Sequence, residues 1–133
     1  MTIESTDRES LIKHRLVQAD ETILDVELLI ENNRLRSAVN RIYYGMFYSL
    51  LALGLAHQFE TGKHAQLIGW FNKNFILEGL LDLKYGKIIN KAFNRRTKGD
   101  YDTYVEFDKQ MVIEMFIEMQ DFISEIRKYL KID

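Results

Sequence analysis

The sequence predicts an all-α fold, an antiparallel up-and-down bundle of about five helices, on the basis of three observations. Proline, which breaks a helix from inside, is absent from the 133 residues. Leucine, isoleucine, lysine and glutamate, which are well tolerated in helices, are abundant. Apolar residues recur at steps of three and four over long segments, the spacing that places them on one face of a helix.

The first two expected helices cover about residues 5–33 and 37–54. Ser5 offers a capping side chain for the first helix, and the asparagine pair ending at Asn33 is expected to stop it. Its apolar stripe comprises Leu16, Ala19, Ile23, Val26 and Ile30. The second helix, with Ser37 as its expected cap, is apolar on most of its circumference and is therefore predicted to be the central helix of the bundle.

The other three expected helices cover about residues 62–79, 82–99 and 104–130. The third and fourth are expected to end at glycines, the residues that most readily leave a helix, and Asp82 is the expected cap of the fourth. The fifth has the cleanest apolar periodicity and is expected to face the core throughout. Short connections between such helices are typical of a bundle, here a single domain over residues 1–133.

Composition limits the classes of protein. Hydrophobic residues make up 47% and charged residues 29% of the chain, as in ordinary globular proteins. The absence of cysteine excludes disulfides, a thiolate nucleophile and a cysteine-bound metal. No uncharged apolar run approaches the roughly 20 residues of a membrane span, and the first residues lack the apolar core of a signal peptide. We therefore expect a cytoplasmic protein that does not enter the membrane.

Positive charge collects in residues 84–104, although the formal net charge of the chain is -2. Six cations precede the first acid of this segment, namely Lys84, Lys87, Lys91, Arg95, Arg96 and Lys98. Lys87, Lys91 and Arg95 are spaced four residues apart and therefore share one face of the expected helix. Two interpretations stay open for that face: it is solvated, or it binds phosphate.

A polar turn is expected after this helix, and further polar residues lie on the central helix. Arg96, Asp100 and Tyr101 place a guanidinium, a carboxylate and a phenol within a few residues, a set that can bind or process an anion. Arg41 and Tyr44 lie on the mostly buried central helix, where an arginine must be paired or must meet an anion. Arg41 is therefore expected either to pair with a carboxylate such as Asp100 or to line the same cleft as Arg96.

The three histidines, His14, His57 and His64, are far apart in sequence and form no metal-binding spacing. We predict no metal site. His64 follows Gly62 at a predicted helix start, where it is either a surface residue near the cap or a group that faces an anion beside the helix N-terminus. The chain has no phosphate-binding loop, dinucleotide fingerprint or nucleophile elbow, and no cofactor is predicted.

Three segments, SAVNRIYYGMFYSLLAL, GKHAQLIGWFNKNFI and GKIINKAFNRRTKGDYD, resemble the HEPN (higher eukaryotes and prokaryotes nucleotide-binding) domain family. The resemblance runs from about residue 37 to residue 104 and is to the small stand-alone bacterial and archaeal members. Its specific part is an NRxYY segment followed by an RxxxDY segment. It implies a helical bundle, a homodimer in which the motif-bearing helices meet, and a nucleotide or RNA ligand.

Many HEPN proteins are metal-independent ribonucleases that carry an arginine, four to six residues and then a histidine, and many are the toxin half of a pair with a minimal nucleotidyltransferase (MNT). In them the arginine steadies the phosphate and the histidine moves the proton of the 2′-hydroxyl. Arg95 or Arg96 matches the arginine here, but Tyr101 or Asp102 takes the histidine position. If Asp102 stands there, Tyr104 matches a tyrosine that the partner can modify with AMP.

The resemblance and the residues together predict a HEPN-domain protein that binds a nucleotide or RNA phosphate in a basic cleft, as the toxin-like half of a pair with an MNT antitoxin. The predicted binding residues are Arg41, Tyr44, His64, Lys91, Arg95, Arg96, Asp100 and Tyr101, with Arg96 as the catalytic candidate and Tyr104 as the modification candidate. Two alternatives stay open. One is a catalytically inactive interaction or dimerisation module, and the other is a metal-independent endoribonuclease with a rearranged acid–base pair that includes His64.

Overall fold

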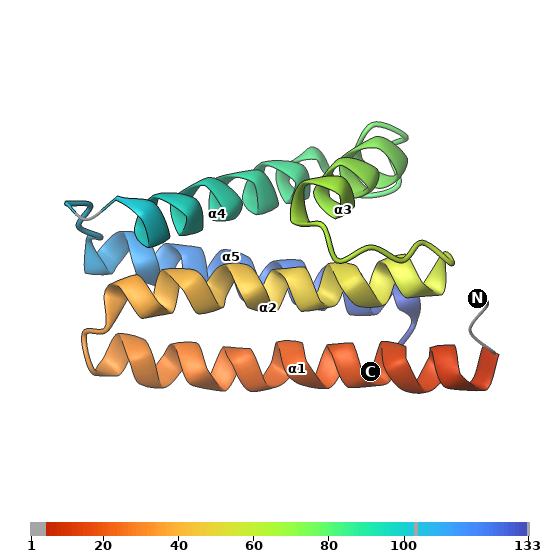
Figure 1. Cartoon of the computed structure of the whole chain (residues 1–133), viewed down its shortest axis with the longest axis horizontal. Coiled ribbons are helices and arrows are strands. Elements are labelled where there is room, and N and C mark those ends of the chain that lie inside the picture. The colour runs from red at the N-terminus through yellow and green to blue at the C-terminus, as the bar shows by residue number, and fades with distance from the viewer. Residues whose placement is uncertain (1–4, 103, 133) are drawn as a thin grey trace.

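The computed structural model of the chain describes residues 5–102 and 104–132, and within those ranges it contains helices and no strand. The helices are α1 (Ser5–Glu31), α2 (Leu35–Ala56), α3 (His64–Phe71), α4 (Leu83–Tyr101) and α5 (Lys109–Leu130), and a single π-helical turn (Asn72–Ile76) follows α3. Figure 1 shows α1, α2, α4 and α5 lying along the longest axis of the molecule, with the short α3 over one end. The prediction of an all-α bundle is confirmed.

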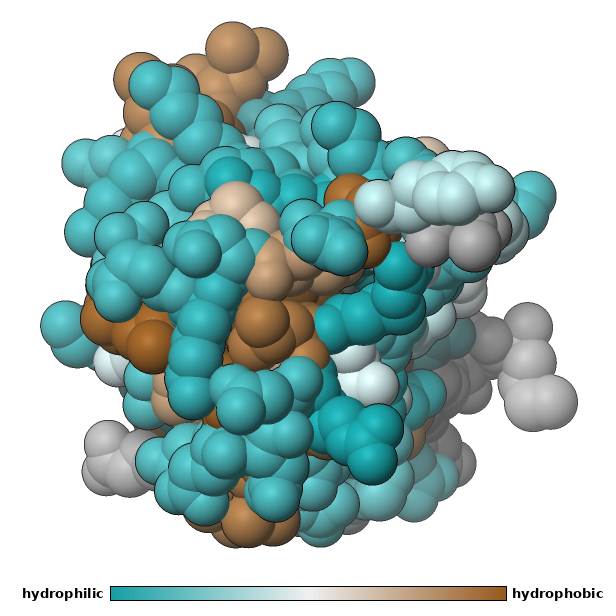
Figure 2. Space-filling view, turned by 90° about the vertical axis from the view of Figure 1, so that its left-hand side faces the viewer, coloured by the Kyte–Doolittle hydropathy of each residue, from teal (hydrophilic) through white to brown (hydrophobic). Residues whose placement is uncertain are grey.

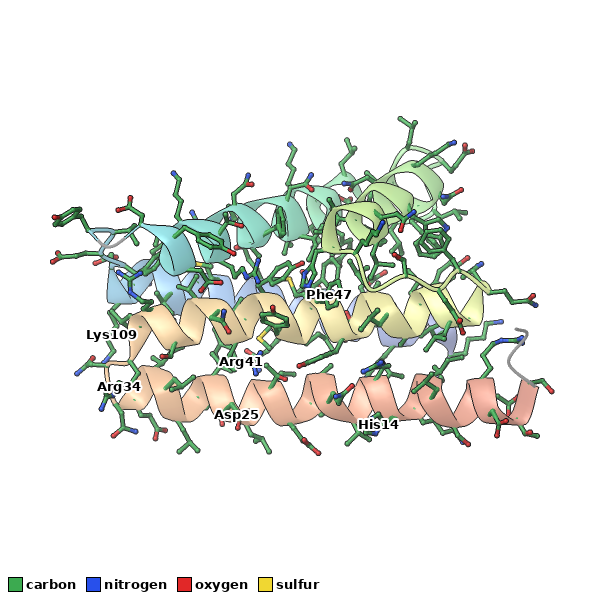
Figure 3. All side chains as sticks on the ribbon, viewed as in Figure 1. His14, Asp25, Arg34, Arg41, Phe47 and Lys109 are labelled. Carbon is green, nitrogen blue, oxygen red and sulfur yellow. The ribbon has the colours of Figure 1, made fainter. Side chains whose placement is uncertain are left out.

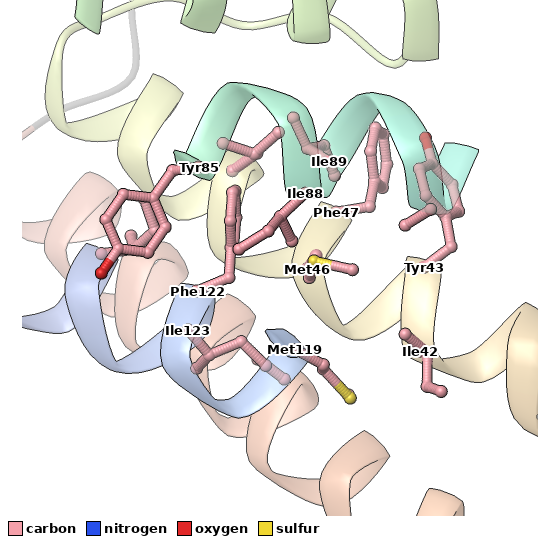
Figure 4. Close-up of a cluster of buried hydrophobic side chains, with 14 of the residues drawn as sticks. Ile42, Tyr43, Met46, Phe47, Tyr85, Ile88, Ile89, Met119, Phe122 and Ile123 are labelled. Carbon is pink, nitrogen blue, oxygen red and sulfur yellow. The ribbon is translucent and has the colours of Figure 1, made fainter. Parts of the chain in front are cut away.

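Helix α2 is the centre of the bundle, as its apolar circumference predicts. It contacts α1, α3, α4 and α5, and it carries no charged residue from Ile42 to its end at Ala56. Figure 4 shows the core where α2 meets α4 and α5, with buried side chains that include Ile42, Met46, Phe47, Ile88, Ile89, Met119, Phe122 and Ile123. Because α2 packs on several sides, its position determines where the other helices lie.

The bounds of α2 differ from the sequence-based ones at both ends. The helix begins at Leu35, ahead of the predicted cap at Ser37, and Arg34 occupies the cap position without a side-chain hydrogen bond. It also continues past Gly54. A Cβ at Gly54 would lie 2.7 Å from the carbonyl oxygen of Phe59, so this glycine allows the following segment to approach the helix closely and does not end it.

The predicted start of α4 is confirmed, whereas its predicted end is wrong. Asp82 caps the helix as predicted, because its Oδ1 accepts a hydrogen bond from the second backbone N–H of the helix at 2.9 Å. The helix runs past the predicted end at Gly99 to Tyr101. Gly99 is buried against Phe107, whose ring atoms would lie 3.3 Å from an added Cβ. The glycine therefore serves packing, and the predicted polar turn is still helical at Asp100.

The third and fifth predicted helices are shorter in the structure. Helix α3 ends at Phe71 and passes into the π-helical turn, and the chain then reverses at Gly79, which has a φ of 76°. Helix α5 begins at Lys109, not near residue 104, because Asp108 provides the cap that defines its first turn.

The surface is mostly polar at the end of the bundle where α1 joins α2 and α4 joins α5. Figure 2 shows this end, with hydrophilic side chains covering most of it and apolar side chains scattered between them. Among the helices of the described residues, none combines the length and the apolar character needed to cross a membrane.

Candidate functional site

The side chain of Arg96, near the end of α4, is held between α2 and a carboxylate of its own helix. Its Nη2 donates a hydrogen bond to the hydroxyl oxygen of Tyr44 at 3.0 Å, and its Nε lies 3.0 Å from Oδ2 of Asp100. The guanidinium carbon lies 5.6 Å from the ring centroid of Tyr43 and 5.4 Å from that of Tyr44, within the range of cation–π attraction. Only 17% of the side chain is exposed, so Arg96 is fixed in direction and largely withdrawn from water.

Asp100 ties this arginine to α2. While Oδ2 faces Arg96, Oδ1 accepts a hydrogen bond from Nδ2 of Asn40 at 3.3 Å. Both carboxylate oxygens are thus engaged, which orients the guanidinium. The interpretation in which Arg41 pairs with Asp100 is wrong, because Asp100 pairs with Arg96.

The side chain of Arg41, also on α2, lies beside the ring of Tyr44. Its guanidinium carbon is 4.8 Å from the ring centroid of Tyr44. Its Nε is buried and has no hydrogen-bond partner among the described residues. A buried N–H without an acceptor costs free energy unless a ligand or water satisfies it. Figure 3 shows Arg41 and Phe47 on α2, the helix that carries most of this site.

His64, the first residue of α3, lies at the same place. Its ring stacks on Phe47 with a centroid distance of 4.0 Å and an interplanar angle of 6°, and its Nδ1 lies 2.6 Å from the hydroxyl oxygen of Tyr43. Burial, and secondarily the charge of Arg96, lower the pKa of His64, so the imidazole is neutral at pH 7. We refer to Asn40, Tyr43, Tyr44, His64, Arg96 and Asp100 as the arginine cluster.

The hydrogen bond between Tyr43 and His64 has a preferred direction. Burial raises the pKa of the Tyr43 hydroxyl, although Arg96 opposes that shift, so the phenol keeps its proton. The hydroxyl needs an acceptor, and Nδ1 of His64 is the one within reach. We therefore assign the hydrogen of the neutral imidazole to Nε2, which makes His64 a donor toward any group that approaches from outside.

Lys91 and Arg95 lie away from the arginine cluster, on the side of α4 that faces α5. The Nζ of Lys91 is 2.9 Å from Oε2 of Glu118. Arg95 lines a small space between helices together with Lys91, Met115 and Glu118. The basic face that the spacing predicted is therefore partly neutralised by Glu118 of α5, and Lys91 and Arg95 face α5 instead of the arginine cluster.

Tyr101 and Tyr104 also lie apart from the cluster. Tyr101 ends α4 with 80% of its surface exposed, and Tyr104 is 92% exposed. Neither side chain makes a hydrogen bond or ring contact within the described residues. The predicted role of Tyr101 in binding and the predicted modification of Tyr104 stay predictions.

Arg36, at the start of α2, is a residue that the sequence analysis missed. Its guanidinium donates hydrogen bonds to the backbone carbonyls of Gly99, of Asp102 at 3.3 Å and of Val105 at 2.8 Å. The last carbonyls of a helix lack hydrogen-bond donors within the helix, and Arg36 provides such donors at the end of α4. It thereby fixes the end of α4 from which Asp100 projects.

The arginine cluster combines side chains of the kinds that bind anions in proteins. It offers an oriented guanidinium, a phenol and a neutral imidazole, and the buried Nε of Arg41 lies next to it. No group of three or more metal-ligating side chains occurs in the described part of the chain. The cluster can therefore bind an oxyanion such as phosphate through hydrogen bonds and charge.

The fold and the cluster define an all-α bundle protein with a half-buried arginine, tyrosine and histidine group at the junction of three helices. The family model of the HEPN domain matches residues 12–129. The chain therefore belongs to the HEPN domain family, and the resemblance predicted from its motifs is confirmed.

Relatives of similar length align with this sequence over most of the chain. A protein of Thermotoga maritima named UPF0332 protein is 36% identical over 125 residues, which is 94% of this chain and 95% of that one. Two proteins of Methanocaldococcus jannaschii carry the name putative toxin. One is 36% identical over 113 residues, 85% of this chain and 84% of the relative, and the other is 32% identical over 117 residues, 87% of this chain and 80% of the relative.

Proposed function

We propose that the arginine cluster binds a phosphate group of a nucleotide or of RNA. The observation that carries this proposal is a half-buried arginine whose Nη2 is hydrogen-bonded to Tyr44 and whose Nε lies at ion-pair distance from Asp100 without a hydrogen bond, while Nη1 has no hydrogen-bond partner among the described residues. The Nε2–H of His64 adds a further donor beside it, and the guanidinium of Arg41 adds positive charge 4.8 Å from the ring centroid of Tyr44. Phosphate oxygens accept such hydrogen bonds, and a preorganised guanidinium holds them more strongly than a solvated one.

The biological setting of this proposal is a toxin-like protein that pairs with a nucleotidyltransferase. Two relatives are named putative toxins, and the family resemblance implies a homodimer and an MNT antitoxin. The exposure of Tyr104 leaves its hydroxyl accessible to a partner that transfers AMP. Expression of the chain is expected to arrest growth, and co-expression of the partner is expected to relieve the arrest.

A metal-independent ribonuclease is the second candidate, favoured by the position of His64 next to Arg96. In that reaction the 2′-oxygen bonds to phosphorus as the bond to the 5′-oxygen breaks, a base must take the 2′-hydroxyl proton, and an acid must give a proton to the departing 5′-oxygen. The Tyr43 hydroxyl occupies Nδ1, so His64 acts as a base only through the other tautomer, in which Nδ1–H donates to Tyr43 and Nε2 is free. The hydrogen bond therefore favours binding over cleavage.

The direct test compares wild type with Arg96→Met, which keeps the length of the side chain and removes its charge. We expect the affinity for AMP and for tRNA, measured without metal, to fall at least about tenfold. Lys98→Met is the matched control, because Lys98 is an exposed cation two residues further along α4, and it should change affinity much less.

The same variants separate the rival functions. A loss of thermal stability or of dimer in Arg96→Met, with affinity unchanged, would replace the proposal with an interaction module. Cleavage of tRNA by wild type that is lost in both Arg96→Met and His64→Gln would establish the ribonuclease.

A further inference from the structure

A pocket of about 410 Å³ lies between α1, α2 and the segment that joins α2 to α3. Its apolar walls are formed by Leu11, Phe47, Leu51, Leu55 and Phe59. Its volume lies within the range of small-molecule sites, which combine apolar walls with a few polar groups that fix orientation. None of its polar groups belongs to the arginine cluster.

The pocket and the arginine cluster share a wall. Phe47 lines the pocket and at the same time stacks on His64 at 4.0 Å. Gly62 lines the pocket two residues before His64, so their Cα atoms lie within about 7 Å of each other. The pocket therefore adjoins the arginine cluster, with Phe47 and the residues before His64 between them.

Two charged side chains give the pocket its polar character. Arg15 donates from Nη1 to Oε1 of Gln18 at 2.9 Å, while its Nε is buried without a hydrogen-bond partner among the described residues. Glu60 lines the pocket from the loop and forms no ion pair in the part of the chain that the structure describes. The pocket is thus lined by a guanidinium from one helix and by a carboxylate from the facing loop.

This pairing matches one nucleobase by its chemistry. Guanine carries acceptors at O6 and N7 and donors at N1–H and the N2 amine, whereas adenine offers an amine where guanine has O6. An arginine is the side chain that most often recognises O6 and N7, and a carboxylate accepts from the two donors. The flat ring would stack on aromatic walls such as Phe47 or Phe59.

We propose that this pocket binds a guanine base whose phosphate lies on the arginine cluster. The proposal rests on the proposed function, because it takes the cluster as the phosphate site and names the base attached to it. The same chemistry is supplied by free GMP or by an unpaired guanosine in single-stranded RNA.

The test measures the affinities of GMP, AMP and inorganic phosphate for wild type, Arg15→Met, Leu51→Trp and the control Lys13→Met. Leu51 is half-buried on the pocket wall, so the larger side chain fills the pocket, and Lys13 is an exposed cation of α1 that does not line it. We expect wild type to prefer GMP over AMP by about tenfold or more. Arg15→Met and Leu51→Trp should abolish that preference and leave phosphate binding, and Lys13→Met should keep both.

Two results would overturn the base site. Equal affinities of wild type for GMP and AMP would do so, as would a preference for GMP that survives both pocket variants. In either case phosphate binding that is still lost in Arg96→Met would leave the proposed function standing. If instead Arg96→Met binds phosphate as wild type does, the proposed function itself is wrong.

Oligonucleotides identify the source of the base. An oligoadenylate containing one guanosine that binds more tightly than GMP identifies single-stranded RNA, and tighter binding of GMP identifies the free nucleotide. A duplex that pairs this guanosine should lose the preference, because pairing occupies the N1–H and the N2 amine that Glu60 would read and takes the base out of reach of the pocket walls. A duplex that binds as well as the single strand would contradict recognition of the base.

Discussion

At the scale of single residues, the function of His64 depends on the phenol behind it. Tyr43 is fully buried in the core, and its hydroxyl fixes which nitrogen of the half-buried imidazole carries the hydrogen. The histidine is thereby oriented by the core of the bundle. The same bond makes the protonation of His64 a matter of fold stability as well as of binding.

The lowered pKa of His64 predicts a specific dependence of stability on pH. Since the folded pKa lies below the ordinary value of about 6.5, the unfolded chain binds more protons as the pH falls through that value. The contribution of His64 to stability is therefore fully present above about pH 6.5 and is lost as the pH falls toward the folded pKa. Wild type should lose more thermal stability between pH 7 and pH 5 than His64→Gln does. Parallel losses in the two proteins would contradict this account, since His14 and His57 are common to both.

At the scale of elements, the approach of the α2–α3 segment to α2 depends on one glycine. A Cβ at Gly54 would meet the carbonyl oxygen of Phe59 at 2.7 Å, and the Phe59 N–H donates to the carbonyl of Gly54 at 2.8 Å. Gly54→Ala should lower the free energy of unfolding by about 1–3 kcal/mol, because backbone atoms have little freedom to move away. Because Phe59 lines the proposed guanine pocket, the Gly54→Ala variant should also show a weaker preference for GMP over AMP.

Gly69 provides the matched control within the same region. It lies in α3, and an added Cβ would meet nothing within 4 Å. Gly69→Ala should raise the free energy of unfolding by about 0.5–1 kcal/mol through helix propensity alone. Chemical denaturation of the two variants measures both effects, and equal shifts in the same direction would refute the close approach at Gly54.

The helices and part of the site could be predicted because their signals are local. Apolar spacing gave the five helical segments, and the motif positions of Tyr44, His64, Arg96 and Asp100 converge in the structure. The spacing of Lys91 and Arg95 showed that they share a face, but it could not show that Glu118 of α5 pairs with Lys91 on that face. Arg36 had no local signal at all, because its carbonyl partner at Gly99 is 63 residues away.

The predicted ends of two helices were wrong for a related reason. Gly54 and Gly99 were expected as helix stops, which is the commonest local meaning of a glycine. Both are instead places where another segment packs against the helix without room for a side chain. A sequence pattern cannot tell these two uses of glycine apart when the packing partner is not yet known.

At the scale of the whole molecule, most buried side chains of α2, α4 and α5 form one continuous core, while Ala52 and Leu55 of α2 pack in a second cluster with Ile12 and Leu16 of α1. Phe122 of α5 is fully buried and contacts the rings of Phe71 and Tyr85. Phe122→Ala should lower the free energy of unfolding by about 3–5 kcal/mol, because it removes a large apolar side chain and leaves a cavity. Lys91→Met, which breaks an exposed ion pair with Glu118, should cost less than about 1 kcal/mol.

Two spectroscopic probes check whether the core unfolds as a unit. Trp70, the only tryptophan, stacks on Phe59 at 4.9 Å and reports on the α3 end of the bundle, while far-ultraviolet circular dichroism reports on all helices. If residues 1–133 form one domain, both transitions coincide and shift together in Phe122→Ala. Separated transitions would show that the α3 region unfolds independently.

The uncharged length of α2 from Ile42 to Ala56 also matters while the chain is being made. A ribosome completes α2 about 70 residues before it reaches Ile126, the last buried residue of α5. At about 5–20 residues per second, about 4–14 s pass between the synthesis of α2 and that of the last buried residue of α5. Until α3, α4 and α5 follow in turn, α1 is the only helix that can cover α2. The nascent chain therefore exposes apolar surface of α2, to which chaperones or a second nascent copy can bind before the C-terminal half of the chain has been made.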